Sequence, residues 1–206
     1  MGKVSVACVP SEFIYAETNA VKVPAITYGP PHPIDQPAPS SIKLNESLII
    51  VEFIADLYPH ASFLPKDPVQ KAKARVFAAS LDSVLLPAMR QALFSGTEGI
   101  AEIYKALDFI QAQLPDGTKY AIGNDFTIAD IAAAPLFAIL EVVFSNDIGM
   151  YEPGEGLKVY EAYKSAKYDK LRGYVKRILE QESVKKVVDT VSQSGLGSVP
   201  SVSPNF

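Results

Sequence analysis

The stretch FTIADIAAAPLFAILEVVF, residues 126–144, limits the possible folds of this chain more than any other. It has the length of a helix and carries only two charged residues, Asp130 and Glu141. A helix that is apolar on all sides belongs in the interior of a protein. Because no uninterrupted apolar run reaches the ~18 residues of a membrane span, we expect this helix at the centre of a helical bundle.

The segment 67–95 has the apolar periodicity of a helix that would pack around this centre. Asp67 is expected to cap it, and Pro68 stands at the first helical position, where a proline is favoured. Pro87 lies inside the segment and should kink or break the helix.

Two more segments, residues 99–115 and 168–191, are predicted to be amphipathic and helical, the second with a break near Glu182. We therefore predict an all-helical domain over residues 67–191. Residues 192–206 are low in charge and rich in Ser and Pro, which predicts a loose tail.

Short β-like runs and prolines fill the part of the chain before the helices. The predicted strands are residues 3–9, 23–29 and 41–44, and a helix is predicted over 45–59. Asn45 is expected to cap this helix, with Glu46 in its first turn. This pattern predicts a small α/β domain over residues 1–60 and a linker over residues 61–66.

Pro24 stands inside the predicted strand 23–29. A proline cannot donate a hydrogen bond to a neighbouring strand, so a central strand disfavours it. Its presence favours an edge strand or a place where the backbone is left free to bind something else.

Composition narrows the classes of partner. The formal charge is −4, from 19 Lys and Arg against 23 Asp and Glu, and no dense basic cluster indicates a nucleic-acid partner. Cys8 is the single cysteine, which excludes an internal disulfide and fits a reducing compartment. His32 and His60 have no second ligand at useful spacing, so no metal is expected. The beginning of the sequence lacks the pattern of a signal peptide, so we expect a cytoplasmic location without membrane partners.

Four short motifs, in this order, resemble those of the cytosolic glutathione transferases. They are KVPAI at 22–26, NES at 45–47, FTIADI at 126–131 and SVKKVVD at 183–189. The proline-rich loop before the NES motif looks most like the omega-like transferases of wood-decay fungi. The resemblance implies a truncated thioredoxin-like N-terminal domain, of α/β type, followed by the all-α bundle of this family.

The resemblance also implies a glutathione site. In the family the proline of the Val-Pro pair is cis, so Val23 would turn its backbone, beside Pro24, toward the cysteinyl unit. Glu46 and Ser47, at a helix N-terminus, would hold the charged γ-glutamyl end, and Lys22 would contact the glycyl end. Each of these residues also has an ordinary structural reading, as a strand or helix-cap residue or as a solvated lysine.

Thr127 and Asp130 form the family's Ser/Thr-x-x-Asp box. We interpret both as structural, with the hydroxyl capping the helix and the acid reaching back to a backbone N–H.

The family's first strand and helix have no counterpart in this sequence, because residues 3–9 match the second strand. The turn between those elements carries the catalytic hydroxyl or thiol, which is therefore not visible. Cys8 and Ser11 are weak candidates that would replace it if the first strand of this chain took the vacant place; Cys8 also fits a small core position. The same loss would expose two strand edges unless they pair with each other or with another chain.

Three functions follow from these expectations. The first is a protein that binds glutathione and small hydrophobic or aromatic ligands, with reduced or absent catalysis. The second is an active omega-like glutathione transferase or thiol transferase, and the third is a non-catalytic dimeric scaffold. The resemblance implies a homodimer in each case.

Overall fold

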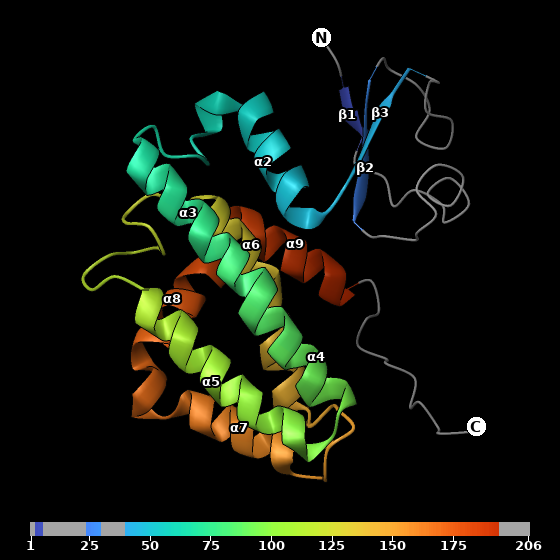
Figure 1. The fold of residues 1–206 in the computed structure, drawn as a ribbon, viewed down its shortest axis with the longest axis vertical. Coiled ribbons are helices and arrows are strands. Elements are labelled where there is room, and N and C mark those ends of the chain that lie inside the picture. The colour runs from blue at the N-terminus through green and yellow to red at the C-terminus, as the bar shows by residue number, and fades with distance from the viewer. Residues whose placement is uncertain (1–2, 6–23, 30–39, 194–206) are drawn as a thin grey trace. The chain divides into compact units, whose positions relative to one another are not determined.

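The computed structural model describes residues 3–5, 24–29 and 40–193 (Figure 1). The chain divides into two compact units, Met1–Lys71 and Ala72–Phe206. The boundaries at residues 60 and 67 remain predictions.

A three-stranded antiparallel sheet forms the first unit, in the order β1-β2-β3. The strands are β1 (Lys3–Ser5), β2 (Ala25–Gly29) and β3 (Ile42–Asn45). The strand that follows Pro24 is therefore the central one of the described sheet, so the edge-strand alternative was wrong, and the other alternative, a backbone left free to bind, stays a prediction. The proline itself stands in a bend just before β2, where its missing N–H costs no pairing.

β1 pairs directly with β2, with Val4 opposite Tyr28 and Ser5 opposite Thr27. One edge of β2 is thus covered by the N-terminal strand of the same chain. This pairing removes the unpaired edge of β2 that the sequence led us to expect, in the part of the chain that the structure describes.

Helix α2 (Ser47–Leu57) covers the sheet of this unit. Ile50 and Ala55 are buried on α2, and Ile26 is buried on β2. The rings of Tyr28 and Phe53 meet edge to face with centroids 5.3 Å apart, which fixes the helix against the strand. The short 3-10 helix η1 (Pro59–Ala61) follows.

The predicted helix 67–95 is α3 (Pro68–Ser80), a π-helical turn η2 (Leu81–Leu85) and α4 (Leu86–Phe94), nearly in line in Figure 1. Asp67 accepts a hydrogen bond from the N–H of Gln70 at 2.8 Å. Pro87 is the second residue of α4 and directly follows a π-helical turn in which the N–H of Leu86 donates to the carbonyl of Leu81, five residues back. The π-turn directly before it absorbs the change of register.

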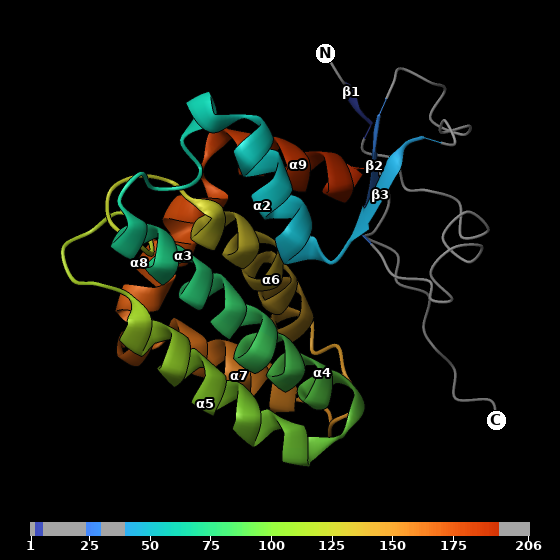
Figure 2. The same cartoon turned by 45° about the horizontal axis from the view of Figure 1, so that its top comes forward.

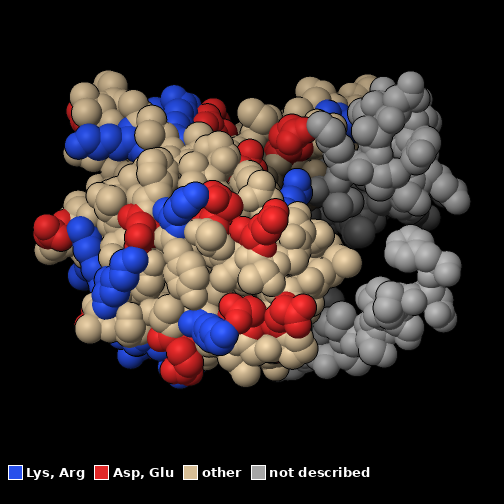
Figure 3. Space-filling model, turned by 60° about the horizontal axis from the view of Figure 1, so that its bottom comes forward, with Lys and Arg blue, Asp and Glu red and all other residues tan. Residues whose placement is uncertain are grey.

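The remaining helices are α5 (Thr97–Gln113), α6 (Ile128–Ser145), α7 (Glu155–Lys164), the 3-10 helix η3 (Ala166–Tyr168), α8 (Asp169–Leu179) and α9 (Glu182–Gln193). α5 lies alongside α4, and α6 packs against α7 and α8 (Figure 2). The core holds large apolar side chains from several helices: Leu85, Ile103, Leu107, Ile110, Phe137, Leu140 and Ile178. No prediction covered α7, which is short and polar. Charged side chains of both signs are mixed over the face shown in Figure 3.

Helix α6 is the central helix that the sequence predicts, but it is not buried on all sides. Phe137, Leu140 and Phe144 are buried, whereas Ile139 and Val142 are exposed. Of the helices described, α6 alone has the length and apolar composition of a membrane span, with about half of it buried inside the protein. A core helix has the same properties, so they do not indicate a membrane protein.

Candidate functional site

The register of the sheet brings two motifs together that lie about twenty residues apart in sequence. Ala25 on β2 is paired with Asn45 on β3. Pro24 comes directly before β2, and Glu46 comes directly after β3. Pro24 and Glu46 therefore lie at the same end of the ladder that β2 and β3 form.

Glu46 has an unusual backbone. Its φ of 69° and ψ of 114° lie in a region that side chains rarely adopt. Such a conformation costs about 1–3 kcal/mol and persists only where its surroundings impose it. It makes Glu46, not Asn45, the N-cap residue of α2, because Asn45 still belongs to β3; the predicted cap was therefore wrong by one residue.

The N-terminus of α2 is open to solvent. Glu46 and Ser47 are exposed, and the side chain of Glu46 does not cap the helix. The first intrahelical bond runs from the N–H of Ile50 to the carbonyl of Glu46 at 3.0 Å. Helix geometry therefore leaves the N–H groups of Ser47, Leu48 and Ile49 without an intrahelical acceptor, at the positive end of the helix dipole. A carboxylate fits such a place chemically.

Four predicted site residues lie outside the described residues. They are Cys8, Ser11, Lys22 and Val23. Pro24 is described and exposed. The roles of all these residues, and those of Glu46 and Ser47, remain predictions.

The N-terminus of α6 is closed by its own side chains. Thr127 is the N-cap, and its hydroxyl accepts a hydrogen bond from the N–H of Ala129 at 3.3 Å. The carboxylate of Asp130 accepts bonds from the N–H of Thr127 at 2.8 Å and from its hydroxyl at 3.2 Å. Both residues are buried.

Asp130 also joins α6 to distant parts of the same unit. Its other oxygen accepts from the N–H of Ala121 at 3.0 Å and from the hydroxyl of Tyr174 on α8 at 3.0 Å. Burial raises the pKa of Asp130, and the four hydrogen bonds oppose that rise. With two donors on each oxygen, this carboxylate serves the fold. The sequence did not indicate Ala121 or Tyr174, because these contacts span 9 and 44 residues.

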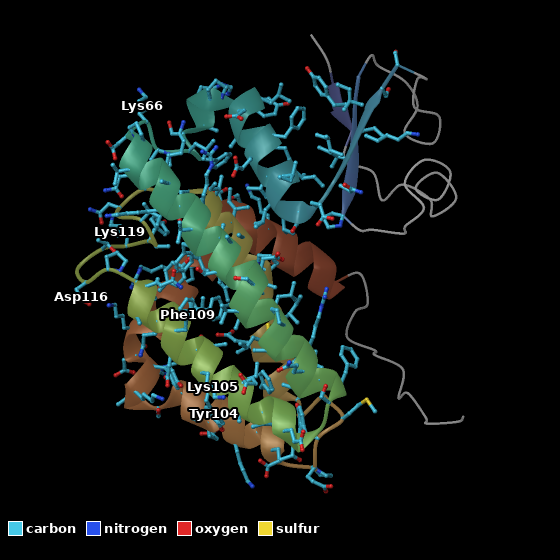
Figure 4. All side chains as sticks on the ribbon, viewed as in Figure 1. Lys66, Tyr104, Lys105, Phe109, Asp116 and Lys119 are labelled. Atoms are coloured by element: carbon cyan, nitrogen blue, oxygen red, sulfur yellow. The ribbon has the colours of Figure 1, made fainter. Side chains whose placement is uncertain are left out.

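The loop between α5 and α6 is tied to α8 at further points. Asp116 and Lys119 stand on this loop (Figure 4). Lys170 pairs with Asp116 at 2.6 Å, and Nε of Arg177 donates to the carbonyl of Lys119 at 2.7 Å. This loop therefore has a structural role in holding α8.

Within the described part of the chain, no cluster of three or more His, Cys, Asp or Glu could hold a metal ion. His60 lies in η1, with its ring edge to face against Tyr58.

Residues 74–177 match the family model described as glutathione S-transferase, C-terminal domain. Glutathione transferase Omega 1C from Trametes versicolor is 39% identical, with a TM-score of 0.78 over 89% of this chain and 78% of that chain. Omega 2S from the same fungus is 33% identical, with a TM-score of 0.79 over 90% and 81%.

A probable glutathione S-transferase from Glycine max is 36% identical over 95 residues, which are 44% of this chain and 42% of that protein. The chain spans about half the length of the curated relatives it matches. The family model matches half of the chain, within the second unit, and the likeness to the omega structures covers 89–90% of the chain and so reaches into the first unit as well. The chain therefore belongs to the glutathione transferase family and resembles its omega class.

Proposed function

We propose that this chain binds glutathione where β2 begins and α2 begins. The observation that carries the proposal is the pairing of Ala25 with Asn45, because it puts Pro24 at the same end of the β2–β3 ladder as the strained Glu46 and the N-terminus of α2. A ligand at this place gives a reason for both the strain and the open helix end, which would otherwise only cost stability.

In this site each part of glutathione has a matching group. The γ-glutamyl carboxylate accepts hydrogen bonds from the N–H groups that begin α2 and from the hydroxyl of Ser47. The carboxylate of Glu46 accepts from the γ-glutamyl ammonium. The backbone of Val23 pairs with the cysteinyl unit as an added strand would, and Lys22 contacts the glycyl carboxylate.

Small aromatic compounds are the second class of ligand that we propose. Omega 2S from Trametes versicolor has been solved with 2,4-dihydroxybenzophenone, and two more distant proteins of this fold have been solved with glutathione. We propose reduced or absent turnover, because no residue in the sequence matches the family's motif for the catalytic hydroxyl or thiol.

A specific observation favours thiol transfer as the second candidate function. The N-terminal strand β1 lies beside β2, the strand that follows Pro24, with Ser5 opposite Thr27. Cys8 follows β1 by three residues in the sequence and lies outside the described residues. In this candidate function the Cys8 thiolate attacks the glutathionyl sulfur of a substrate disulfide, the substrate leaves as a thiolate, and a second glutathione releases Cys8 as glutathione disulfide. Loss of thiol-transferase activity in Cys8→Ala, with glutathione binding unchanged, is the expected result, and unchanged activity would remove this candidate.

We further propose a homodimer that uses the outer side of α3 and α4. Val76 on α3 and Phe94 on α4 are each more than 60% exposed. Large exposed apolar side chains on these helices are compatible with a protein interface. Sedimentation of the full chain and of Val76→Lys tests this arrangement; a monomer in both would contradict it, and a dimer lost in Val76→Lys would support it.

Thermal unfolding with millimolar glutathione tests the binding site. Binding at 100 times Kd stabilises the folded state by about 2.7 kcal/mol, so the midpoint should rise. Ser47→Ala should reduce the rise, because one hydroxyl donor is lost. Ser183→Ala is the matched control, since Ser183 is also an exposed serine in the first turn of a helix, α9. No rise in the unaltered chain would favour a non-catalytic scaffold.

A further inference from the structure

One side of α6 has the composition of a buried surface but is exposed. Residues 131–140, IAAAPLFAIL, contain no polar side chain. Pro135 is exposed on this helix, Ile139 is 50% exposed and Val142 is 57% exposed. At spacings of four and three residues, these side chains lie along one face. We call Pro135, Ile139 and Val142 the α6 stripe.

Helix α6 has no fully exposed charged side chain that would favour contact of the stripe with solvent. Asp130 is fully buried, and Glu141 is half-buried, with the hydroxyl of Tyr163 3.5 Å from its carboxylate. Helix α5 of the same unit is different, because Lys105 and Asp108 are exposed on its outer side. A solvent-facing helix side normally carries such charges. The α6 stripe therefore has the character of a surface that another segment covers.

We propose that residues 194–206 of this chain cover the α6 stripe. This segment, SGLGSVPSVSPNF, contains no charged side chain, so its docking on an apolar surface would bury no charged side chain. Its apolar side chains recur every three or four residues, at Leu196, Val199, Val202 and Phe206. It is thus an uncharged segment with repeated apolar anchors, which matches an uncharged stripe with apolar side chains at similar intervals.

The segment starts in the right part of the molecule and is long enough. It follows α9, which packs against α8, and α8 packs against α6. The 18 residues of α6 are about 27 Å long, at 1.5 Å per residue. The 13 residues 194–206 span up to about 43 Å when extended, at 3.3 Å per residue. The segment can therefore run the full length of the stripe and still bridge the distance from a neighbouring helix.

Tryptophan fluorescence of the full chain tests this docking, because the protein contains no tryptophan of its own. Phe206→Trp adds one reporter in the segment. A docked segment gives an emission maximum at shorter wavelength than free tryptophan and a severalfold weaker quenching by acrylamide. Val142→Lys, made in the Phe206→Trp chain, should shift the emission toward that of free tryptophan and restore quenching. The matched control is Leu157→Lys, since Leu157 is an exposed apolar residue on α7 and should leave the emission unchanged.

Three results would overturn the proposal. The first is a solvent-like emission of Phe206→Trp in the otherwise unaltered chain, which needs no further variant to interpret. The second is a shifted emission that Val142→Lys does not change while circular dichroism shows that this variant is folded. The third is a shift that appears only at high protein concentration, since a second copy would then be the occupant.

Discussion

Two helix N-termini in this protein solve the same physical problem in opposite ways. Every helix begins with N–H groups that lack an intrahelical acceptor. At α6, the side chains of Thr127 and Asp130 accept hydrogen bonds from backbone N–H groups at the start of the helix, and both residues are buried. At α2, the side chain of the N-cap residue Glu46 does not cap the helix, and Glu46 and Ser47 are exposed.

The difference extends to the backbone. Thr127 has the extended conformation that N-cap residues usually adopt, with φ −127°. Glu46 instead has φ 69°, which costs about 1–3 kcal/mol. The N-terminus of α6 therefore stabilises the fold. The N-terminus of α2 lowers its stability and stays accessible to solvent, as expected of a ligand-binding site.

The largest expected effect concerns the closed end. Asp130→Ala removes the acceptor of four buried hydrogen bonds and leaves several donors unsatisfied. At about 1–3 kcal/mol for each unsatisfied group, we expect a loss of about 4 kcal/mol in the free energy of unfolding, measured with urea. Glu182→Ala, in the exposed first turn of α9, is the control and should cost less than about 1 kcal/mol. A loss below 1 kcal/mol in Asp130→Ala would contradict the structural role of this carboxylate.

At the open end, the strain of Glu46 can be measured with a pair of variants. Glu46→Gly and Glu46→Ala lose the same side chain beyond Cβ but differ in their tolerance of positive φ. We expect the Gly variant to be about 1 kcal/mol more stable than the Ala variant in urea unfolding. Equal stabilities would mean that the backbone at position 46 is not strained.

Tyr174→Phe probes one link of the closed end. It removes the hydrogen bond to Asp130 and leaves the ring, which packs against Phe77, in place. Because the freed oxygen of Asp130 keeps its bond from Ala121, we expect a loss of about 1 kcal/mol. If the variant lost as much stability as Asp130→Ala, Tyr174 would have a further role.

The smallest effect is a pH dependence at an exposed carboxylate. Hydrogen bonds from Lys167 and Tyr168 lower the pKa of Asp108 below its ordinary value of 3.8. A lowered pKa in the folded state contributes stability above pH 3.8, and this contribution is lost as the pH falls through the folded value. Since Asp108 is exposed, we expect less than about 1 kcal/mol. Between pH 2 and pH 5, the free energy of unfolding of Asp108→Asn, measured with urea, should fall less with decreasing pH than that of the unaltered chain. An equal pH dependence in both proteins would argue against the hydrogen bonds from Lys167 and Tyr168 to Asp108.

Most of the correct predictions came from patterns of residues close together in the sequence. The spacing of Thr127 and Asp130 is visible because both residues act within one turn of helix. Pro24 and Glu46 were singled out by family motifs, but only the register of β2 and β3 shows that they lie at the same end of one ladder. A sequence does not display this register, because several pairings of short strands satisfy the same apolar pattern.

Contacts between distant residues explain the errors. Asn45 is a good helix cap by residue type, yet pairing with Ala25 keeps it in β3 and moves the cap to Glu46. The apolar composition of α6 predicted burial on every side, whereas Val142 is exposed. Helix α7 was missed because its short, polar sequence gives a weak periodic signal, and its burial of Tyr163 depends on neighbouring helices.

The central claim is that the open N-terminus of α2 binds glutathione and the closed N-terminus of α6 does not. Backbone amide chemical shifts, measured by NMR during a glutathione titration, report on both helix ends in one experiment. We predict saturable shifts for the amides of Ser47, Leu48 and Ile49 and none for those of Ala129 and Asp130. Unmoved amides at the start of α2, with glutathione present at saturating concentration, would contradict the account.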